Sequence, residues 1–367
     1  MTRSSMRWLP AALVPVAIAG AALVGSYQAG AVTALPQKSA ADIIAMVARS
    51  DVRALSGTLS QTSDLGLPQL PSAGPFPSTG STSQGAAAAI ELLGTSHTAR
   101  VYLDGPSKAR FQVMDTLAER DVVRNGNELW LYSSKENTAT HLTLPPEPGT
   151  GTHAPAKHAT NTPGATTPEA LAQRFLAAVD PSTEVTVGEA TTLAGRTAYE
   201  LVLKPRSAGT LVDSVSIAVD SVTGLPLGID VQARGQTAPA FSLAFSAVNL
   251  SAPDASLFNF TPPPGAAVQQ KAIPQMPAMP SKEQAGKHPT VTGPTVTGSG
   301  WDAVASFPAG TLPADVRATP ALTQVTQAVP GGRALTTSLV TVLMLDDGRV
   351  FAGMVPLDRL QAAAAHQ

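Results

Sequence analysis

Apolar and polar residues alternate along four stretches of the chain, and this period of two limits what the chain can fold into. The stretches are residues 199–204, 214–219, 225–232 and 241–246. Successive side chains of a β-strand point to opposite faces, so the alternation gives each strand one apolar and one polar face. It predicts an antiparallel sheet with one dry and one wet face, in which residues 220–224 form a turn between two strands.

A helix is expected to lead into the first strand of the chain. Ser39 and, three residues later, Asp42 can satisfy the free N–H groups of a first helical turn. Helical spacing puts three apolar residues on one side of this helix: Ile43, Ile44 and Val47. Residues 52–66 then read as a strand.

Shorter strands are expected between residues 95 and 144. They cover residues 100–103, 109–116, 120–124, 128–133 and 140–144. Asn125-Gly126 separates two of them and predicts a hairpin, because both residue types tolerate positive φ.

A second helix is expected to begin at Thr166 or Thr167, with Pro168 and Glu169 in its first turn. Its buried side would consist of Leu171, Phe175, Ala178 and Val179. A helix followed by strands therefore occurs twice, over residues 39–144 and 167–264.

The N-terminus has the pattern of an export leader. Arg3 and Arg7 precede an apolar run over residues 8–25, and small residues follow at 29–34. The same pattern fits an uncleaved anchor, since the run is near the lower limit of ~17 residues for a spanning helix. Either interpretation keeps the arginines on the cytoplasmic side. We therefore expect the bulk of the chain in the extracytoplasmic cell envelope, secreted or tethered, with residues 1–34 as signal peptide or anchor.

Stretches rich in proline, glycine, serine and threonine divide the rest of the chain. Residues 67–85 and 145–166 are expected to be loops inside a domain spanning 39–265, and residues 266–300 a linker. A small unit would follow at 301–367. Its expected elements are a helix from Thr319-Pro320 that carries Leu322, Val325 and Val329, a hairpin of residues 339–345 and 350–355, and a helix over 357–365.

Composition argues against several functions. The chain has no cysteine, so disulfides, thiolate catalysis and cysteine-based metal sites are excluded. Only 14% of the residues are charged and 4% aromatic, which argues against nucleic-acid binding. His153 and His158 lie close in sequence without a carboxylate beside them, and no serine has the surroundings of a nucleophile. We therefore expect no metal, no cofactor and no catalysis.

Five segments together resemble the LolA/RseB-like family of envelope lipoprotein carriers and lipid-binding sensors. The resemblance covers roughly residues 39–265. The segments are SAADIIAMVARSDVRALSGTLSQTSDLGLPQLP, DVVRNGNELWLYSSKENTATHL, LAGRTAYELVLKPR, VSIAVDSVTGLPLGIDV and LSAPDASLFNFTPPPGA. The second resembles a Gly…Trp-x-Tyr hairpin of that family, and the fourth resembles its Asp-x-x-Thr-Gly-x-Pro turn.

The resemblance implies an α+β fold, an incomplete antiparallel β-barrel covered by helices, with the small C-terminal unit outside the family's core. It also implies an apolar cavity for acyl chains. For each candidate cavity residue, plain core packing is the competing interpretation, and which strand face lines a cavity stays open. The candidates are Ile43, Ile44, Val47, Phe111, Val113, Leu129, Leu131, Leu201, Leu203, Val215, Ile217, Leu227, Ile229, Phe241 and Phe245.

The function implied is binding of a lipid or an acylated lipoprotein, as carrier or chaperone, without catalysis. Each buried methylene contributes ~0.8 kcal/mol, so such binding needs no charged group. The alternative is a regulatory or sensor module that acts through a membrane-protein partner, either an anti-sigma factor or an ABC-type transporter. A structural cell-wall role is a third possibility.

Overall fold

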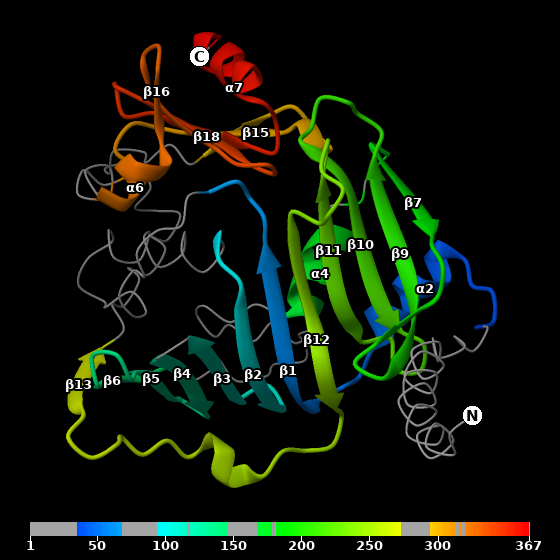
Figure 1. The fold of residues 1–367 in the computed structure, drawn as a ribbon, viewed down its shortest axis with the longest axis vertical. Coiled ribbons are helices and arrows are strands. Elements are labelled where there is room, and N and C mark those ends of the chain that lie inside the picture. The colour runs from blue at the N-terminus through cyan, green and yellow to red at the C-terminus, as the bar shows by residue number, and fades with distance from the viewer. Residues whose placement is uncertain are drawn as a thin grey trace, which may run out of the picture. The chain divides into compact units, whose positions relative to one another are not determined.

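The computed structural model describes residues 35–67, 94–115, 118–144, 167–177, 181–272, 294–312 and 320–366, together with Val179 and Val316. Contacts divide the chain into two units, residues 1–36 and residues 37–367. The features below belong to the second unit. The predicted leader, nearly all of the 67–85 loop and the 145–166 loop lie outside the described residues. The described part is mainly β-structure, with two sheets and four α-helices (Figure 1).

The larger sheet has thirteen strands in the order β13-β6-β5-β4-β3-β2-β1-β12-β11-β10-β9-β7, with β8 pairing with β9. It is antiparallel except where β13 runs parallel to β6. The order ends at β13 and β7, which do not pair with each other among the described residues. The sheet is therefore open, which confirms the incomplete, unclosed sheet of the expected half-barrel. The strands are β1 (Ala54–Ser63), β2 (His97–Asp104), β3 (Lys108–Asp115), β4 (Ala118–Asn125), β5 (Glu128–Ser133), β6 (Thr138–Thr143), β7 (Thr183–Val187), β8 (Thr191–Leu193), β9 (Arg196–Pro205), β10 (Val212–Asp220), β11 (Pro226–Ala233), β12 (Phe241–Asn249) and β13 (Ala267–Ala272).

Most predicted strands are confirmed, but several short ones were missed. The Asn125-Gly126 hairpin joins β4 to β5, and Gly126 has a φ of +62°. Strands β7 and β8 were not predicted. The stretch 266–300, expected to be only a linker, contains β13 and the short β14 (Thr295–Thr297). These strands are short and polar, so alternation of apolar residues could not reveal them.

Two helices pack on the main sheet. Helix α2 (Ala40–Arg49) begins at Ser39, whose side chain and that of Asp42 form the predicted reciprocal cap. It packs against β7 and β9, while α4 (Pro168–Ala177) packs against β11 and β12. Figure 1 shows both helices behind strands β9 to β12.

The predicted buried side of α4 is partly wrong. Pro168 and Ala172 are its buried residues, whereas Leu171 and Phe175 are half-buried. Val179 lies beyond the end of the helix, and the side chain of Ala178 is outside the described residues. The small Ala172 is fully covered because it brings the helix backbone close to the sheet, which a search for large apolar residues overlooks.

A second sheet of six strands occupies the C-terminal part, in the order β14-β15-β19-β18-β17-β16. The predicted hairpin is confirmed as β18 paired with β19, and the predicted last helix is α7. Val329 was expected in a helix, but it ends β16, because α6 already stops at Val325. The remaining elements are β15 (Val304–Phe307), β16 (Gln327–Val329), β17 (Gly332–Thr336), β18 (Thr341–Leu345), β19 (Val350–Gly353), α6 (Pro320–Val325) and α7 (Leu357–Ala365).

The turn between β10 and β11 explains the Asp-x-x-Thr-Gly-x-Pro pattern. Asp220 is 1% exposed and accepts hydrogen bonds at 2.9 and 2.8 Å from Arg196 of β9. It also accepts hydrogen bonds from the backbone and hydroxyl of Thr223. Burial acts to raise the pKa of Asp220, but the hydrogen bonds from Arg196 and Thr223 outweigh it and lower that pKa.

Gly224 in the same turn lets helix α2 approach closely. It has a φ of +73°, and an added Cβ would lie 2.4 Å from the carbonyl oxygen of Met46 in α2. Any side chain at this position would therefore both strain the turn and push the helix away from the sheet.

The substitution Gly224→Ala is expected to lower the free energy of unfolding by about 3 kcal/mol, since it combines backbone strain with a clash against main-chain atoms. Gly235→Ala is the matched control, because Gly235 has a φ of +80° with nothing within 4 Å of an added Cβ. The control should cost only about 1 kcal/mol. Urea unfolding measures both values, and equal losses would contradict the close approach of α2.

Candidate apolar binding face

One face of the large sheet carries two rows of apolar side chains. Residues directly opposite in a ladder share a face. The first row consists of Leu201, Ile217, Ile229 and Leu243, on β9 to β12. The second row consists of Val101, Phe111, Val122 and Leu131, on β2 to β5.

The pairing of β1 with β12 makes these rows one face. Leu59 of β1 lies opposite Phe245 of β12, and Gly57, two residues away from Leu59, lies opposite Val101. Since residues two apart on a strand point the same way, the face continues from β9 to β5. The same rule places the other strand candidates on it: Val113, Leu129, Leu203, Val215, Leu227 and Phe241. The structure thus brings all the predicted strand residues to one face.

Burial separates these candidates into two groups. On β9 to β11 they are at most 1% exposed, as expected of packed protein core. Ile43 and Val47 of α2 are likewise buried, at 0% and 5%, while Ile44 is half-buried. Phe111, Leu129 and Phe245 are also buried, at 2–5% exposure. Three of the strand candidates keep part of their surface accessible: Val113, Leu131 and Phe241.

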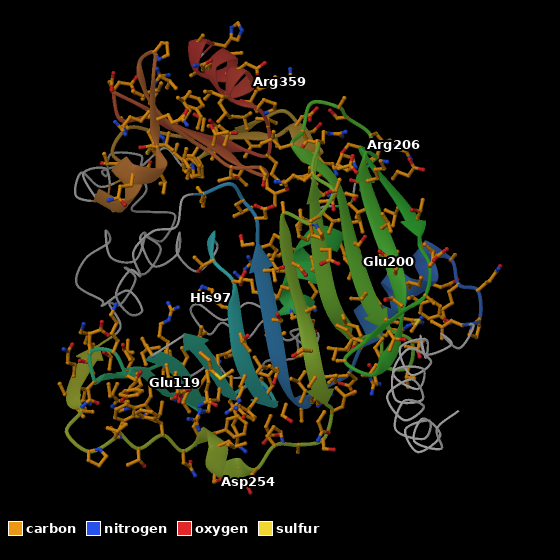
Figure 2. The ribbon with its side chains drawn as sticks, viewed as in Figure 1. His97, Glu119, Glu200, Arg206, Asp254 and Arg359 are labelled. Carbon is orange, nitrogen blue, oxygen red and sulfur yellow. The ribbon has the colours of Figure 1, made fainter. Side chains whose placement is uncertain are left out.

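Trp130 and Tyr132 point to the opposite face of β5. There the chain after β12 crosses strands β3 to β6 and covers them, and Phe260 packs at ring distances of 5.4 Å from Trp130 and 5.8 Å from Tyr132. Asp254, labelled in Figure 2 within this crossing segment, caps the short helix η2 (Ala255–Phe258). Trp130 and Tyr132 therefore pack against the crossing chain, and the odd-numbered residues of β5 belong to the apolar face.

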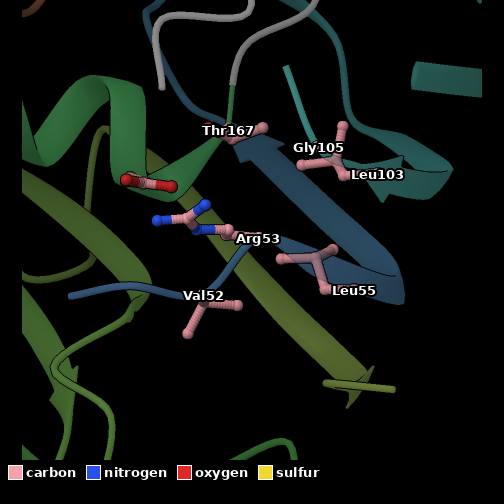
Figure 3. Close-up of a pocket in the computed structure, with 7 residues that line it drawn as sticks. Val52, Arg53, Leu55, Leu103, Gly105 and Thr167 are labelled. Atoms are coloured by element: carbon pink, nitrogen blue, oxygen red, sulfur yellow. The ribbon is translucent and has the colours of Figure 1, made fainter. Parts of the chain in front are cut away.

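A small pocket opens between the apolar face and α4 (Figure 3). Leu55 and Leu103 lie opposite each other on β1 and β2 and contribute its apolar wall. The other lining residues are Val52, Arg53, Gly105, Thr167 and Glu169. Its volume is about 20 Å³, enough for a water molecule but far below the ~300 Å³ of a typical small-ligand site.

A few charged side chains lie at or beside the apolar face. Glu169, in the first turn of α4, accepts a hydrogen bond at 3.1 Å from Gln173, and burial raises its pKa. Arg120 and Arg124 flank Val122 on β4, so their side chains share the apolar face, and they are 7% and 8% exposed. Sequence reasoning missed these arginines, because a charged residue in a strand ordinarily marks the wet face.

The opposite face of β4 carries a buried carboxylate. Asp121 is 2% exposed and pairs at 2.6 Å with Arg110 of β3, which also donates to the carbonyl oxygen of Leu257 in the crossing segment. Burial raises the pKa of Asp121 to about 6, a nearby Glu119 (labelled in Figure 2) adds to the rise, and the hydrogen bonds from Arg110 oppose it.

The described residues contain no group of three or more histidine, aspartate or glutamate side chains placed to hold a metal ion. His153 and His158 are outside them. No helix within the described ranges is long and apolar enough to cross a membrane.

Comparison with known proteins gives similarity at the level of fold. No family model matches the chain, and no curated protein matches it. Among solved structures, MucB in its complex with MucA from Pseudomonas aeruginosa is 17% identical, with a TM-score of 0.41 over 89% of this chain and 96% of that one. A LolA superfamily protein from Nitrosomonas europaea is 11% identical, with a TM-score of 0.24 over 61% of this chain and 99% of that one.

These similarities agree with the LolA/RseB-like resemblance of the sequence motifs. TM-scores below 0.5 at such identities are too low to carry any inference about ligand or partner. What the chain binds must therefore be argued from its own apolar face and from the groups around it.

The substitution Asp121→Asn is expected to change how stability depends on pH. Because its pKa is raised from 3.8 to about 6, the folded chain binds this proton more tightly than the unfolded chain. The free energy of unfolding therefore falls as pH rises from 4 to 6.5, by about 2 kcal/mol from this group. The amide cannot titrate, so the variant should lack this component. Urea unfolding at several pH values would contradict the argument if both proteins showed the same slope.

Proposed function

We propose that the chain is an extracytoplasmic protein that binds acyl chains of lipids or lipoproteins on its apolar face, as a carrier or chaperone without turnover. The observation that supports this most is the apolar face itself, which runs from β9 to β5 and keeps Val113, Leu131 and Phe241 partly accessible. Apolar surface that stays partly accessible to water is a candidate contact surface for an apolar ligand. The export pattern of residues 1–34 supports the location.

Binding requires the pocket beside α4 to widen. Its volume of about 20 Å³ cannot admit an acyl chain. The residues on β9 to β11 are fully packed, so they stabilise the fold and do not touch the ligand in this proposal. The ligand would instead extend from Leu55 and Leu103 across β2 to β5, where the half-buried Val113 and Leu131 lie.

The tight interior also favours one alternative. A regulatory module that acts through a membrane-protein partner needs a docking surface and not a cavity, and the fully buried positions on β9 to β11 fit such a packed interior. The two functions differ in whether the isolated chain takes up an acyl ligand.

Leu131→Gln is expected to weaken binding of palmitic acid roughly tenfold, because it removes about 1.5 kcal/mol of apolar contact at an accessible position. Val268→Gln is the control, since Val268 lies on β13 and is 56% exposed. Equilibrium dialysis with radiolabelled palmitic acid measures both. Equal affinities for the two variants would remove Leu131 from the site, and absence of palmitic acid binding in the unaltered chain would favour the regulatory alternative.

Ile217→Asp is expected to unfold the chain and not merely to abolish binding. Ile217 is 0% exposed, so the carboxylate would be buried without a partner at a cost of several kcal/mol. Circular dichroism should show loss of the native thermal transition. A folded variant that only lost palmitic acid binding would place Ile217 in an open cavity.

A further inference from the structure

Helix α4 is connected at its far end to the C-terminal sheet through a tryptophan. The ring of Phe175 stacks on Trp301 at 6.2 Å with an angle of 18° between the planes. Trp301 lies in the short helix η3 (Gly300–Asp302), is 6% exposed, and donates from Nε1 to Thr183 Oγ1 of β7 at 2.8 Å. A buried indole with its N–H satisfied is a well-fixed surface for a stacking partner.

The same helix forms one wall of the pocket. Thr167 and Glu169, at its beginning, line the pocket, and Leu171, one turn later, packs against the apolar cluster that contains Leu55 and Phe111. Since the pocket is too small for an acyl chain, it must enlarge, and displacement of α4 would move one of its walls. One end of α4 thus lies at the binding face and the other at Trp301.

Contacts that do not involve α4 hold Trp301 in place. The backbone N–H of Leu211 and the hydroxyl of Thr210 donate to the carbonyl oxygen of Met354 at 2.8 and 2.7 Å. Ser207 donates to Asp302, the residue next to Trp301. These bonds join the loop between β9 and β10 to the C-terminal sheet, so Trp301 keeps its position whether or not Phe175 is stacked on it.

We propose that Trp301 is a clamp on α4, by which the C-terminal sheet controls opening of the acyl-binding face. The inference rests on the proposed function. Stacking stabilises the closed position of α4, and a ligand that needs the open position must displace Phe175 from Trp301. A contact made only in the closed state lowers the apparent affinity by the factor with which it favours that state. Breaking the stack therefore tightens binding.

The test uses two independent measurements on the full chain. The three tryptophans are Trp8, Trp130 and Trp301, so the variant Trp8→Phe/Trp130→Phe reports on Trp301 alone. Palmitic acid is expected to shift its fluorescence emission. Equilibrium dialysis with radiolabelled palmitic acid, which needs no tryptophan, is expected to show a dissociation constant three- to tenfold lower for Phe175→Ala than for the unaltered chain.

Two further variants complete the test, the first as a second probe of the stack and the second as a control. Phe175→Leu keeps an apolar side chain but loses the ring, and should also bind more tightly. Val296→Gln alters a side chain of β14 that is 65% exposed and lies outside these contacts, and should leave the dissociation constant within twofold. If palmitic acid binds but Trp301 emission stays constant, or if the Phe175 variants bind no more tightly, the clamp is wrong while the proposed function stands. If palmitic acid does not bind at all, both are wrong.

Discussion

The pairing of β1 with β12 is the constraint on which the rest of the structure depends. These strands lie far apart in the sequence, and their ladder joins two groups of locally paired strands into one sheet. Gly57 allows it: an added Cβ there would lie 2.8 Å from the ring of Phe245 and 2.7 Å from the carbonyl oxygen of Ala247. The missing side chain of Gly57 is replaced by the ring of Phe245, which keeps the apolar face continuous across the junction.

Different segments pack on the two halves of this sheet, on either side of the β1–β12 junction. Beyond β12, the helices α2 and α4 pack on β7, β9, β11 and β12, and the apolar residues of β9 to β11 become core. On the β2 to β6 side, the chain after β12 crosses the opposite face and is fixed by Arg110 and by the rings around Phe260. The apolar face of β3 and β5 keeps partly accessible residues, which is why we place the ligand there and treat the helix-covered side as the stabilising part.

Much of the sheet could be predicted because the sequence patterns that specify it lie within single strands and turns. Alternation identified β9 to β12 and the face of each candidate residue relative to its neighbours, and Asn125-Gly126 and the Asp220 turn marked two connections. The structure adds what depends on distant partners. Leu131 and Trp130 have similar apolarity, and only the position of Phe260 decides which of them packs against the crossing chain. Likewise, nothing near Trp301 in the sequence indicates that it meets Phe175, and the polar β7 and β13 become strands only through pairing with β9 and β6.

The most direct test of acyl-chain binding is native mass spectrometry of the chain purified from its host without detergent. Our account predicts an added mass of a lipid or an acylated peptide, lost on stripping with organic solvent and restored with palmitic acid. A single mass equal to that of the polypeptide, unchanged after addition of palmitic acid or an acylated peptide, would contradict it and would leave a regulatory role through a protein partner.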